Sequence, residues 1–377
     1  MSLSEDIKDF GLDLGYSKVG ITRADSFPEY ITELNGRRDM YGWYIDGVFQ
    51  PLKGAEPKNC MSTAKSIIVF THDIFKQAFP ENLTGKVGRH YQSRANLTVR
   101  HRINGARRQL MRDFLEKNGI NVAQRVVTPD RMAAARAGIC TYGRNTFAFG
   151  DNVGSFIIIA AFITDAELQY DEPTFETKCP PKCTACIDAC PTGALYEPMK
   201  MNPLRCIAFN TFMTQENYVP GVNSYIPPDI REKMGSWLHG CDICQEVCPR
   251  NQKKLKAKLA PDEYLVKVAN DFNFINPLNM TDEFFAKRVQ MLMPNYIREK
   301  KYFQRNAAIA MGNSGDVSYI PHLAKAMQDS EEIVRGYAAW ALGKLGGQKA
   351  KQALDSSLPR ETSQFARNEI ETALANL

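Results

Sequence analysis

The sequence contains no long hydrophobic run. Its most apolar stretch, residues 154–163, has the length of a strand, whereas a membrane-spanning helix needs about 20 apolar residues. We therefore expect no transmembrane segment. The first residues carry neither a secretory signal nor a twin-arginine leader, and Ser2 with Glu5 resembles the capping box of a helix. Because disulfide bonds belong to secreted chains, we expect a cytoplasmic protein without them.

Extremes of composition are missing as well. Of the 377 residues, 44% are hydrophobic and 24% are charged, which is typical of a soluble globular protein. This length is enough for two or three domains with cores of their own. The formal net charge of +5 is mild, so it permits a polyanionic partner without requiring one.

Cysteine is abundant, but it is concentrated in one segment. Of the 10 cysteines, all except Cys60 and Cys140 lie between residues 179 and 248, mainly in the runs C-P-P-K-C-T-A-C-I-D-A-C-P and C-D-I-C-Q-E-V-C-P. Both runs contain the C-x2-C-x3-C-P spacing of two-cluster ferredoxins, in which the last cysteine of each run binds the cluster of the other run. Zinc sites instead use two C-x2-C pairs without the C-P endings. We therefore predict two 4Fe–4S clusters.

The crossing pattern assigns four ligands to each cluster. The predicted ligands of the first cluster are Cys179, Cys183, Cys186 and Cys248. The predicted ligands of the second cluster are Cys190, Cys206, Cys241 and Cys244. The spacing from Cys179 to Cys183 is one residue longer than usual, and we expect the Pro180–Pro181 pair to bulge outward. Outside the segment, we expect both cysteines to be buried spare thiols, with a reactive role for Cys140 as the alternative.

The N-terminal part of the chain alternates between helical and strand patterns, which favours an α/β or α+β domain. We expect helices over 4–14, 99–117 and 130–137, and strands over 18–21, 66–71, 120–127 and 154–164. The helix over 99–117 is rich in basic residues, namely Arg100, His101, Arg102, Arg107, Arg108 and Arg112. They indicate either a solvated helix face or a surface that contacts phosphates.

The last part of the chain repeats itself. The motif N-A-A-I-A-M-G at 306–312 is echoed by Y-A-A-W-A-L-G at 337–343, and Leu323 and Leu354 keep the same offset. Small alanines let helices approach closely, so the pattern indicates a short HEAT-like repeat. We expect a second helix to start within 316–323. We also expect residues 260–300 to be helical, and the repeat to pack on these helices and to bind a partner.

Taken together, these motifs resemble the epoxyqueuosine reductase family over most of the chain. The resemblance rests on C-T-A-C-I-D-A-C-P-T-G-A at 183–194, G-C-D-I-C-Q-E-V-C-P at 240–249 and R-N-A-A-I-A-M-G at 305–312. It implies a nitroreductase-like domain that holds base-off cobalamin (1–165), a two-cluster ferredoxin-like domain (166–255) and a helical HEAT-like part (256–377). It also implies reduction of epoxyqueuosine to queuosine in tRNA, with electrons from a ferredoxin- or flavodoxin-type donor.

The resemblance also implies site residues. Cobalamin contacts are expected at Tyr91, Tyr142, Arg144, Asn145, Ser155 and Asp242. The family usually carries V-D-T-x-P-x-x-E-R, whose aspartate is the proposed proton donor, but here V-V-T-P-D-R at 126–131 puts Val127 in the acid's place. We therefore expect Tyr142 to donate the proton, with Arg144 stabilising its phenolate, ahead of Asp130. The D-x-H-x-x-G lower-ligand signature is absent, which fits a base-off corrinoid and equally fits no corrinoid.

Two other functions stay open. A cobalamin-dependent reductase of a small molecule, such as an organohalide, is favoured by Val127 and by G-R-N at 143–145, which reductive dehalogenases also show. An electron carrier that reduces a partner corrinoid protein would need only the cluster pair. If tRNA is the substrate, Arg305, Arg335 and Lys344 are expected to contact its phosphates, and binding should weaken with salt.

Overall fold

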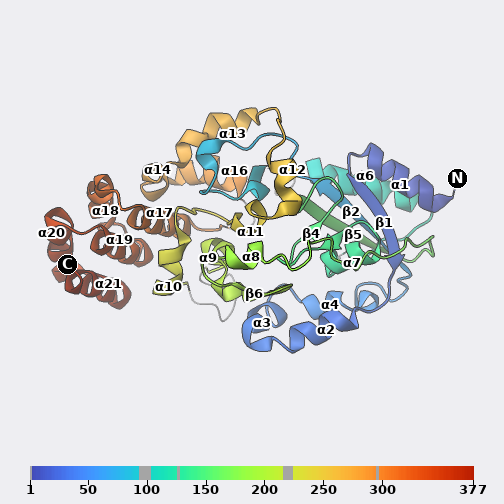
Figure 1. The fold of residues 1–377 in the computed structure, drawn as a ribbon, viewed down its shortest axis with the longest axis horizontal. Coiled ribbons are helices and arrows are strands. Elements are labelled where there is room, and N and C mark those ends of the chain that lie inside the picture. The colour runs from blue at the N-terminus through green and yellow to red at the C-terminus, as the bar shows by residue number, and fades with distance from the viewer. Residues whose placement is uncertain (1, 93–102, 125–127, 215–223, 294–296) are drawn as a thin grey trace.

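The chain is elongated in this computed structural model, which describes residues 2–92, 103–124, 128–214, 224–293 and 297–377. The N-terminal sheet lies at one end, the cysteine-rich segment in the middle and the repeat helices at the other end (Figure 1). Within the described residues we find no helix with the length and apolar character of a membrane span.

The N-terminal sheet has three strands, in the order β1 (Lys18–Arg23), β2 (Ser66–Asp73) and β5 (Ile157–Thr164). Both strand pairs are antiparallel. Of the two expected classes, α+β therefore describes this sheet, whereas α/β, which implies a parallel sheet, is wrong for it. Helices cover both faces. Ile68 and Phe70 of the central strand share a core with α1 and α6, while Ile67 and Val69 share one with α7. This alternation explains why β2 is buried along its whole length.

The helices around the sheet agree with the sequence prediction. Helix α1 (Leu3–Asp13) begins with the predicted capping box, in which Ser2 and Glu5 satisfy each other's backbone N–H groups. Helices α6 (Ile103–Lys117) and α7 (Asp130–Arg136) lie where helical patterns were found, although residues 99–102 are outside the described part of the chain.

The strand expected at 120–127 is not formed over its described residues. Only Val122 makes a bridge, to Thr164 on the edge of β5, and residues 125–127 are not described. The Arg112 guanidinium donates hydrogen bonds to the carbonyl oxygens of Val122 (3.3 Å) and Ala123 (3.1 Å). These carbonyls are therefore satisfied by a side chain instead of by a strand ladder.

Three helices that the sequence patterns did not indicate lie between β1 and β2. They are α2 (Pro28–Asn35), α3 (Arg38–Ile45) and α4 (Pro51–Gly54). Trp43 on α3 packs edge-on against Phe209, which follows the predicted cluster ligand Cys206, with ring centroids 4.8 Å apart. Helices α2 and α3 therefore connect the sheet region to the cysteine-rich segment.

The cysteine-rich segment is built from short elements. Its helices are α8 (Ala185–Asp188), α9 (Ile207–Phe212), α10 (Pro228–Arg231), α11 (Ile243–Glu246) and α12 (Gln252–Leu255), and its hairpin is formed by β6 (Leu195–Glu197) and β7 (Lys200–Met201). A second small hairpin precedes it, formed by β3 (Thr141–Tyr142) and β4 (Ala148–Phe149). Helices α8 and α11, each inside a cysteine run, contact each other.

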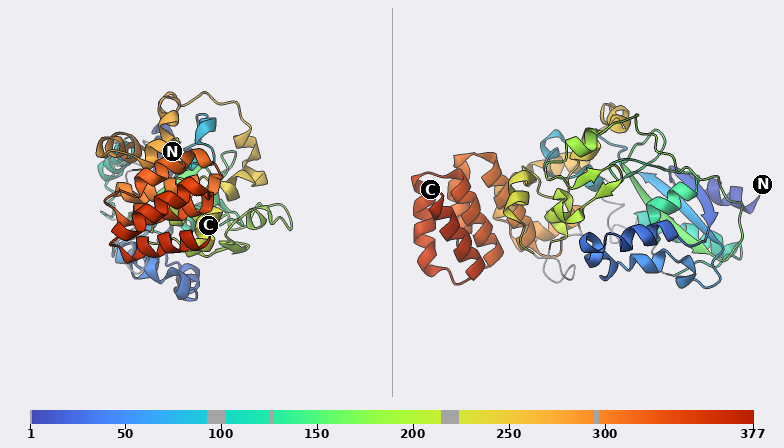
Figure 2. Two further views of the ribbon diagram at one scale, coloured as in Figure 1. Left: turned by 90° about the vertical axis from the view of Figure 1, so that its left-hand side faces the viewer. Right: turned by 60° about the horizontal axis from the view of Figure 1, so that its bottom comes forward.

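The C-terminal part is helical, as predicted. The residues before the repeat form α13 (Glu263–Val268), α14 (Ile275–Leu278), α15 (Asp282–Phe284) and α16 (Gln290–Leu292), and the repeat comprises α17 (Lys300–Ser314), α18 (Ile320–Ala326), α19 (Glu332–Leu345), α20 (Gln348–Ser357) and α21 (Gln364–Ala375). Figure 2 shows the repeat helices stacked at one end of the molecule. Their α18 begins within 316–323, as expected, after a turn capped by Asp316.

Close helix approach explains the repeated small residues. A Cβ on Gly312 of α17 would lie 3.0 Å from the Ala341 Cα of α19, and a Cβ on Gly343 would lie 2.9 Å from the Ala373 Cα of α21. Leu323 and Leu354 are both fully buried. The core of the repeat continues into the earlier helices and includes Leu83 of the N-terminal part. The repeat therefore packs on the rest of the chain, as expected, and this core crosses the predicted domain boundaries.

Candidate functional site

The eight cysteines of the segment lie in two groups of four. Burial raises the pKa of Cys186 to about 11, and the sulfurs of Cys248, Cys179 and Cys183 around it act in the same direction. Their mutual influence places these four thiols together, in the combination predicted for the first cluster.

The remaining four thiols form the second group. Burial raises the pKa of Cys241, and the nearby Cys206 and Cys190 sulfurs raise it further. Burial also raises the pKa of Cys244, next to Cys206 and Cys241. The two groups are neighbours, because Cys186 of the first group also acts on Cys244.

A small hollow lies between the sulfurs of the first group. It is lined by Arg144, Asn145, Cys179, Pro180, Cys183, Ala185, Cys186, Cys248 and Pro249. Four thiols around one hollow fit a 4Fe–4S cluster, whose ligands surround a multi-atom core. Within the described residues, no three His, Cys, Asp or Glu side chains converge closely enough to hold a single metal ion.

The extra residue in the first run turns outward, as predicted. Pro180, Pro181 and Lys182 are exposed, and Lys182 takes a left-handed backbone conformation with φ of 56°. The Cys183 N–H donates to the carbonyl oxygen of Pro180 at 3.1 Å, which closes the turn. The insertion therefore keeps both flanking cysteines in the first group.

Hydrogen-bond donors face several sulfurs. Burial opposes ionisation of Cys179, but hydrogen bonds from Thr177, from the Arg144 backbone N–H and from Arg250 lower its pKa below the usual range. Burial raises the pKa of Cys206, and the N–H groups of Phe209 and Ala208 at the start of α9 lower it. Such donors favour the thiolate form, which is the form that binds iron.

Tyr142 lies half-buried beside the first group. Its backbone carbonyl accepts hydrogen bonds from Thr177 Oγ1 (2.8 Å) and Arg250 Nη1 (3.1 Å). Burial raises the pKa of the phenol, while the guanidinium groups of Arg131 and Arg136 lower it. The side chain is therefore held in a partly desolvated position beside two cations.

The predicted pairing of Tyr142 with Arg144 is wrong in this structure. The Arg144 guanidinium donates to the carbonyl oxygen of Cys183 at 2.6 Å, and its backbone N–H reaches the Cys179 sulfur at 3.4 Å. The cause is the tight turn between β3 and β4, where the Thr146 N–H donates to the Gly143 carbonyl. This turn directs residue 142 toward Arg131 and residue 144 toward the cysteines.

Asp130 lies at the exposed start of α7. Its carboxylate accepts a hydrogen bond from Thr128 Oγ1 at 2.6 Å. Partial desolvation raises its pKa, while Thr128, Arg108 and Arg131 lower it. One cation, Arg131, therefore lowers the pKa of both Asp130 and Tyr142. Val127, at the position of the family's acid, is outside the described residues.

The sequence reasoning missed a group of tyrosines next to Tyr142. The hydroxyl groups of Tyr30 on α2 and Tyr44 on α3 lie 3.5 Å apart. Burial raises the pKa of Tyr30, and it is close enough to Tyr142 and Arg131 that the first raises this pKa further and the second lowers it. Tyr41 on α3 donates to the Met201 carbonyl at 2.8 Å. The aromatic run Y-G-W-Y at 41–44 was the available signal.

The other predicted cobalamin contacts are buried and committed to protein partners. Asn145 Nδ2 donates to the Cys244 carbonyl at 3.2 Å, and Ser155 Oγ donates to Gln245 Oε1 at 2.8 Å. The Asp242 carboxylate accepts from the Arg89 backbone N–H at 2.6 Å. These side chains join the N-terminal region to the second cysteine run.

Tyr91 belongs to the same buried junction. Its ring lies 4.3 Å from the His239 ring, centroid to centroid, and against Gly240, which precedes Cys241. Of the six predicted cobalamin contacts, Tyr142 and Arg144 are therefore the two that remain half-exposed beside the first cysteine group.

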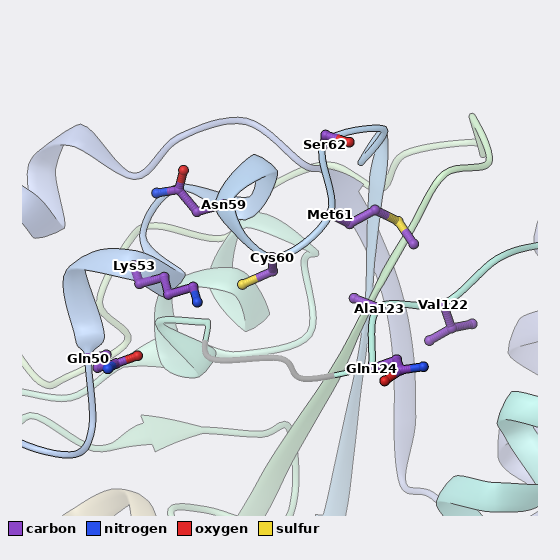
Figure 3. A pocket seen from close by; sticks show the side chains of 9 residues that line it. All are labelled: Gln50, Lys53, Asn59, Cys60, Met61, Ser62, Val122, Ala123 and Gln124. Carbon is purple, nitrogen blue, oxygen red and sulfur yellow. The ribbon is translucent and has the colours of Figure 1, made fainter.

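The two spare cysteines have different surroundings. Cys140 is buried, and burial raises its pKa to about 12, which fits an unreactive thiol. Cys60 is half-buried and borders a cavity of about 520 Å³ between α4 and residues 122–124, into which the Lys53 side chain also reaches (Figure 3). The cavity contains none of the predicted site residues.

The basic residues of α6 that the structure describes face their own domain. Arg108 and Arg112 lie over the Phe162 ring, 5.2 and 5.6 Å from its centroid, and Arg107 contacts His72. Residues 100–102 are outside the described part. For the described arginines the phosphate-contacting interpretation is not supported, because they stabilise the sheet region.

Of the predicted phosphate contacts of the repeat, that of Arg305 is wrong. Arg305 is fully buried and cannot reach a phosphate. Arg335 pairs with Glu361 at 2.7 Å, and Lys344 pairs with Glu232 at 3.2 Å. Basic character alone did not reveal that these side chains have partners within the chain.

Comparison with known proteins identifies two segments. Residues 179–251 match the family described as "4Fe-4S double cluster binding domain", and residues 290–375 match "HEAT repeats". The epoxyqueuosine reductase of Bacillus subtilis (strain 168) is 30% identical, over 99% of this chain and 95% of its own length. That of Staphylococcus aureus (strain NCTC 8325 / PS 47) is 28% identical, over 98% and 95%.

Solved structures agree with the sequence comparison. A crystal structure of epoxyqueuosine reductase with an epoxyqueuosine-modified tRNA-Tyr stem loop is similar to the whole of this chain and to 98% of its own, with a TM-score of 0.82 and 28% identity. A Bacillus subtilis epoxyqueuosine reductase whose catalytic aspartate loop is swung out of the active site has a TM-score of 0.81 and 28% identity, over 100% of this chain and 99% of its own.

Proposed function

The chain belongs to the epoxyqueuosine reductase family, and from this we propose that it reduces epoxyqueuosine in tRNA to queuosine. The observation that carries the proposal is the full-length similarity, which includes both cysteine runs and the repeat. A relative that is similar over its whole length holds a modified tRNA stem loop. The same proposal includes a division into three domains, with boundaries at residues 165 and 255. It also includes a cytoplasmic location, where tRNA is found, and an electron donor of the ferredoxin or flavodoxin type.

Two 4Fe–4S clusters supply the electron path in this proposal. The first is held by Cys179, Cys183, Cys186 and Cys248, and the second by Cys190, Cys206, Cys241 and Cys244. Support comes from the grouping of the thiols, from the hollow between the first four and from the N–H groups that face Cys179 and Cys206. Thiolates hold such clusters, and hydrogen bonds to their sulfurs tune the reduction potential.

Base-off cobalamin, in the nitroreductase-like N-terminal domain, completes the proposed cofactor set. When bound, it supplies a strongly reducing cobalt centre. The residues that would hold it are Tyr142 and Arg144, because both are half-exposed and Arg144 also contacts the first cysteine group. Asn145, Ser155 and Asp242 act indirectly in this proposal, by fixing the second cysteine run against the N-terminal region.

The chain must also supply a proton when the epoxide is reduced. We assign this role to the Tyr142 hydroxyl. Burial, the largest influence, raises the pKa of the phenol, and Arg131 and Arg136 partly offset this by stabilising the phenolate that remains after donation. A positioned acid contributes about 10² to 10⁴ in rate. Asp130 is the second candidate, and it shares Arg131 with Tyr142.

The test is direct. The protein is purified without oxygen, its clusters are reconstituted, and cobalamin, a reductant and epoxyqueuosine-containing tRNA are added. Conversion of epoxyqueuosine to queuosine, measured by mass spectrometry of the digested nucleosides, is the expected result. A protein that holds both clusters and cobalamin but leaves the tRNA unchanged would contradict the substrate proposal.

A second candidate function is a corrinoid-dependent reductase of a small molecule, similar to reductive dehalogenases. The observation that favours it is the phenol of Tyr142 beside cationic Arg131, in a chain where Val127 replaces the family's acid. Release of halide from an organohalide by the same preparation, without activity on tRNA, would put this function first.

A further inference from the structure

The first helix of the repeat carries a fully buried arginine. Arg305 on α17 has 0% of its surface exposed. Its Nη1 donates to the carbonyl oxygens of Thr214 (2.8 Å) and Ser224 (2.9 Å), and its Nη2 to those of Asn210 (2.9 Å) and Thr211 (3.5 Å). A buried cation is tolerated only when its donors are satisfied, and here backbone carbonyls satisfy them. Arg305 is therefore tied to the backbone at Asn210, Thr211, Thr214 and Ser224.

Asn210 and Thr211 lie in the last turn of α9, and Thr214 lies just beyond its end. This helix begins directly after Cys206, and the N–H groups of Ala208 and Phe209 in its first turn hydrogen-bond to the Cys206 sulfur. The last carbonyls of a helix have no partner within it. Arg305 donates to the carbonyls of Asn210 and Thr211, and Thr214 Oγ1 also donates to that of Asn210. The repeat therefore helps to hold the far end of the helix, while its near end donates to a predicted ligand.

The neighbouring residue holds the second cysteine run. Asn306 Nδ2 donates to the carbonyl oxygens of Thr211 and Leu238, both at 2.8 Å. Thr211 Oγ1 in turn accepts from the Gly240 N–H at 2.9 Å, and Gly240 directly precedes Cys241. The segments that carry Cys206 and Cys241 therefore both depend on two adjacent side chains of α17.

We propose that Arg305 and Asn306 are positioning residues for the second 4Fe–4S cluster, and that the packing of the repeat thereby sets the reduction potential of this cluster. The proposal rests on the proposed function, because it assumes a cluster at the second cysteine group. Hydrogen bonds to ligand sulfurs and the surrounding protein set such potentials. The Cys179 sulfur of the first cluster takes its hydrogen bonds from Thr177, Arg144 and Arg250, and none of these is a contact of Arg305. We therefore expect Arg305 to act mainly on the second cluster.

The test is a redox titration of the anaerobic holoprotein, with the two clusters followed separately by electron paramagnetic resonance. Arg305→Lys keeps the charge but loses the planar fork that holds the end of α9. Relaxation of α9 weakens the hydrogen bonds to Cys206 and disfavours the reduced cluster. We expect the ratio of reduced to oxidised second cluster to fall about tenfold at a fixed potential, or about 59 mV for one electron. The first cluster should keep its potential.

Arg335→Lys is the matched control. Arg335 is another arginine of the repeat that donates to backbone carbonyls, those of Asp329 and Ser330, but these residues and its ion-pair partner Glu361 all lie inside the repeat. An unchanged second cluster in Arg305→Lys, or an equal shift in Arg335→Lys, overturns the proposal. If Arg305→Lys does not fold, Asn306→Asp gives the same reading, because it removes the donors to Thr211 and Leu238. A shift of the second cluster alone supports the proposal, and no shift overturns it.

The titration also separates this proposal from the proposed function. It requires neither tRNA nor cobalamin. Wild-type protein that shows both cluster signals but does not convert tRNA contradicts the substrate assignment and leaves the positioning role standing. Wild-type protein without a second cluster overturns the positioning role, whatever its activity.

Discussion

Arg144 donates from its guanidinium to the carbonyl oxygen of Cys183 at 2.6 Å, and this contact joins the β3–β4 turn to the first cysteine run. The backbone N–H of the same residue faces the Cys179 sulfur. Arg144 thus belongs to the surroundings of the first predicted cluster, and the cation beside Tyr142 is a different residue, Arg131.

A substitution at Arg144 should therefore affect the first cluster. In Arg144→Met the Cys183 carbonyl loses a charged donor, and a hydrogen bond of this kind contributes about 1.5–3 kcal/mol. We expect faster loss of the first cluster in air and an altered spectrum for it, with the second cluster unchanged. Arg131→Met, which leaves the contact with Cys183 intact, is the control. If Arg131→Met loses the first cluster and Arg144→Met keeps it, Arg144 does not support this cluster, and its predicted pairing with Tyr142 would be restored.

Crossed ligation gives a second prediction. Cys248 lies in the second run but in the first group of thiols, so Cys248→Ser should damage the cluster of the first run. Cys190→Ser should damage the cluster of the second run. Iron content and electron paramagnetic resonance of anaerobic protein measure both. Loss of the second cluster in Cys248→Ser would reverse the assignment.

The proton donor gives a third prediction. Tyr142→Phe should lower turnover roughly a hundredfold or more, the low end of the range for a positioned acid, with both clusters and cobalamin retained. Asp130→Asn should lose much less. Tyr170→Phe is the control, because Tyr170 donates to the Lys65 carbonyl away from this site. If Asp130→Asn abolishes turnover and Tyr142→Phe does not, the aspartate performs the family's usual role from a shifted position.

The ion pair between Arg335 and Glu361 gives a prediction for stability against pH. The hydrogen bond from Arg335, the largest influence, lowers the pKa of Glu361 in the folded protein. A lowered pKa stabilises the fold above the pKa of the unfolded chain, and this contribution is lost as pH falls through the folded pKa. Arg335→Met should therefore be clearly less stable than wild type near pH 7, by about 1 kcal/mol or more, and this difference should shrink below about pH 4.

Urea unfolding at several pH values measures this difference. Lys351→Met is a suitable control, because its contact with Asp355 is long, at 3.9 Å, and exposed. A difference between Arg335→Met and wild type that stays constant from pH 7 to pH 3 would show that the ionised Glu361 is not the cause.

Helix approach in the repeat gives the last prediction. A Cβ on Gly343 would lie 2.6 Å from the Ala373 Cβ, with the Ala373 backbone directly behind it, so Gly343→Ala should destabilise the protein by about 1–3 kcal/mol. Gly42→Ala in α3 is the matched control, because nothing lies within 4 Å of its added Cβ and alanine favours a helix. Thermal unfolding compares the two. Equal stability would mean that α19 and α21 are free to separate.

Features that depend on local spacing could be predicted from the amino-acid sequence. The cysteine runs carry their cluster pattern within a few residues of each other, and the repeated N-A-A-I-A-M-G motif reports the face on which α17 meets α19. The outward turn at Pro180 also followed from one extra residue between two ligands. These inferences hold because the physical constraint lies within a single short segment.

Contacts between segments that are distant in the sequence could not be predicted in this way. Arg305 is a basic residue of a repeat helix, yet it is buried, because the carbonyl oxygens of Asn210, Thr214 and Ser224 accept its hydrogen bonds. Tyr142 and Arg144 are two residues apart, yet because of the turn at Gly143 the Tyr142 side chain lies near Arg131, whereas Arg144 hydrogen-bonds to the Cys183 carbonyl. Val122 has strand character, but the Arg112 side chain satisfies its carbonyl. In each case the outcome depends on which partner satisfies a polar group, and that is settled only when the chain packs.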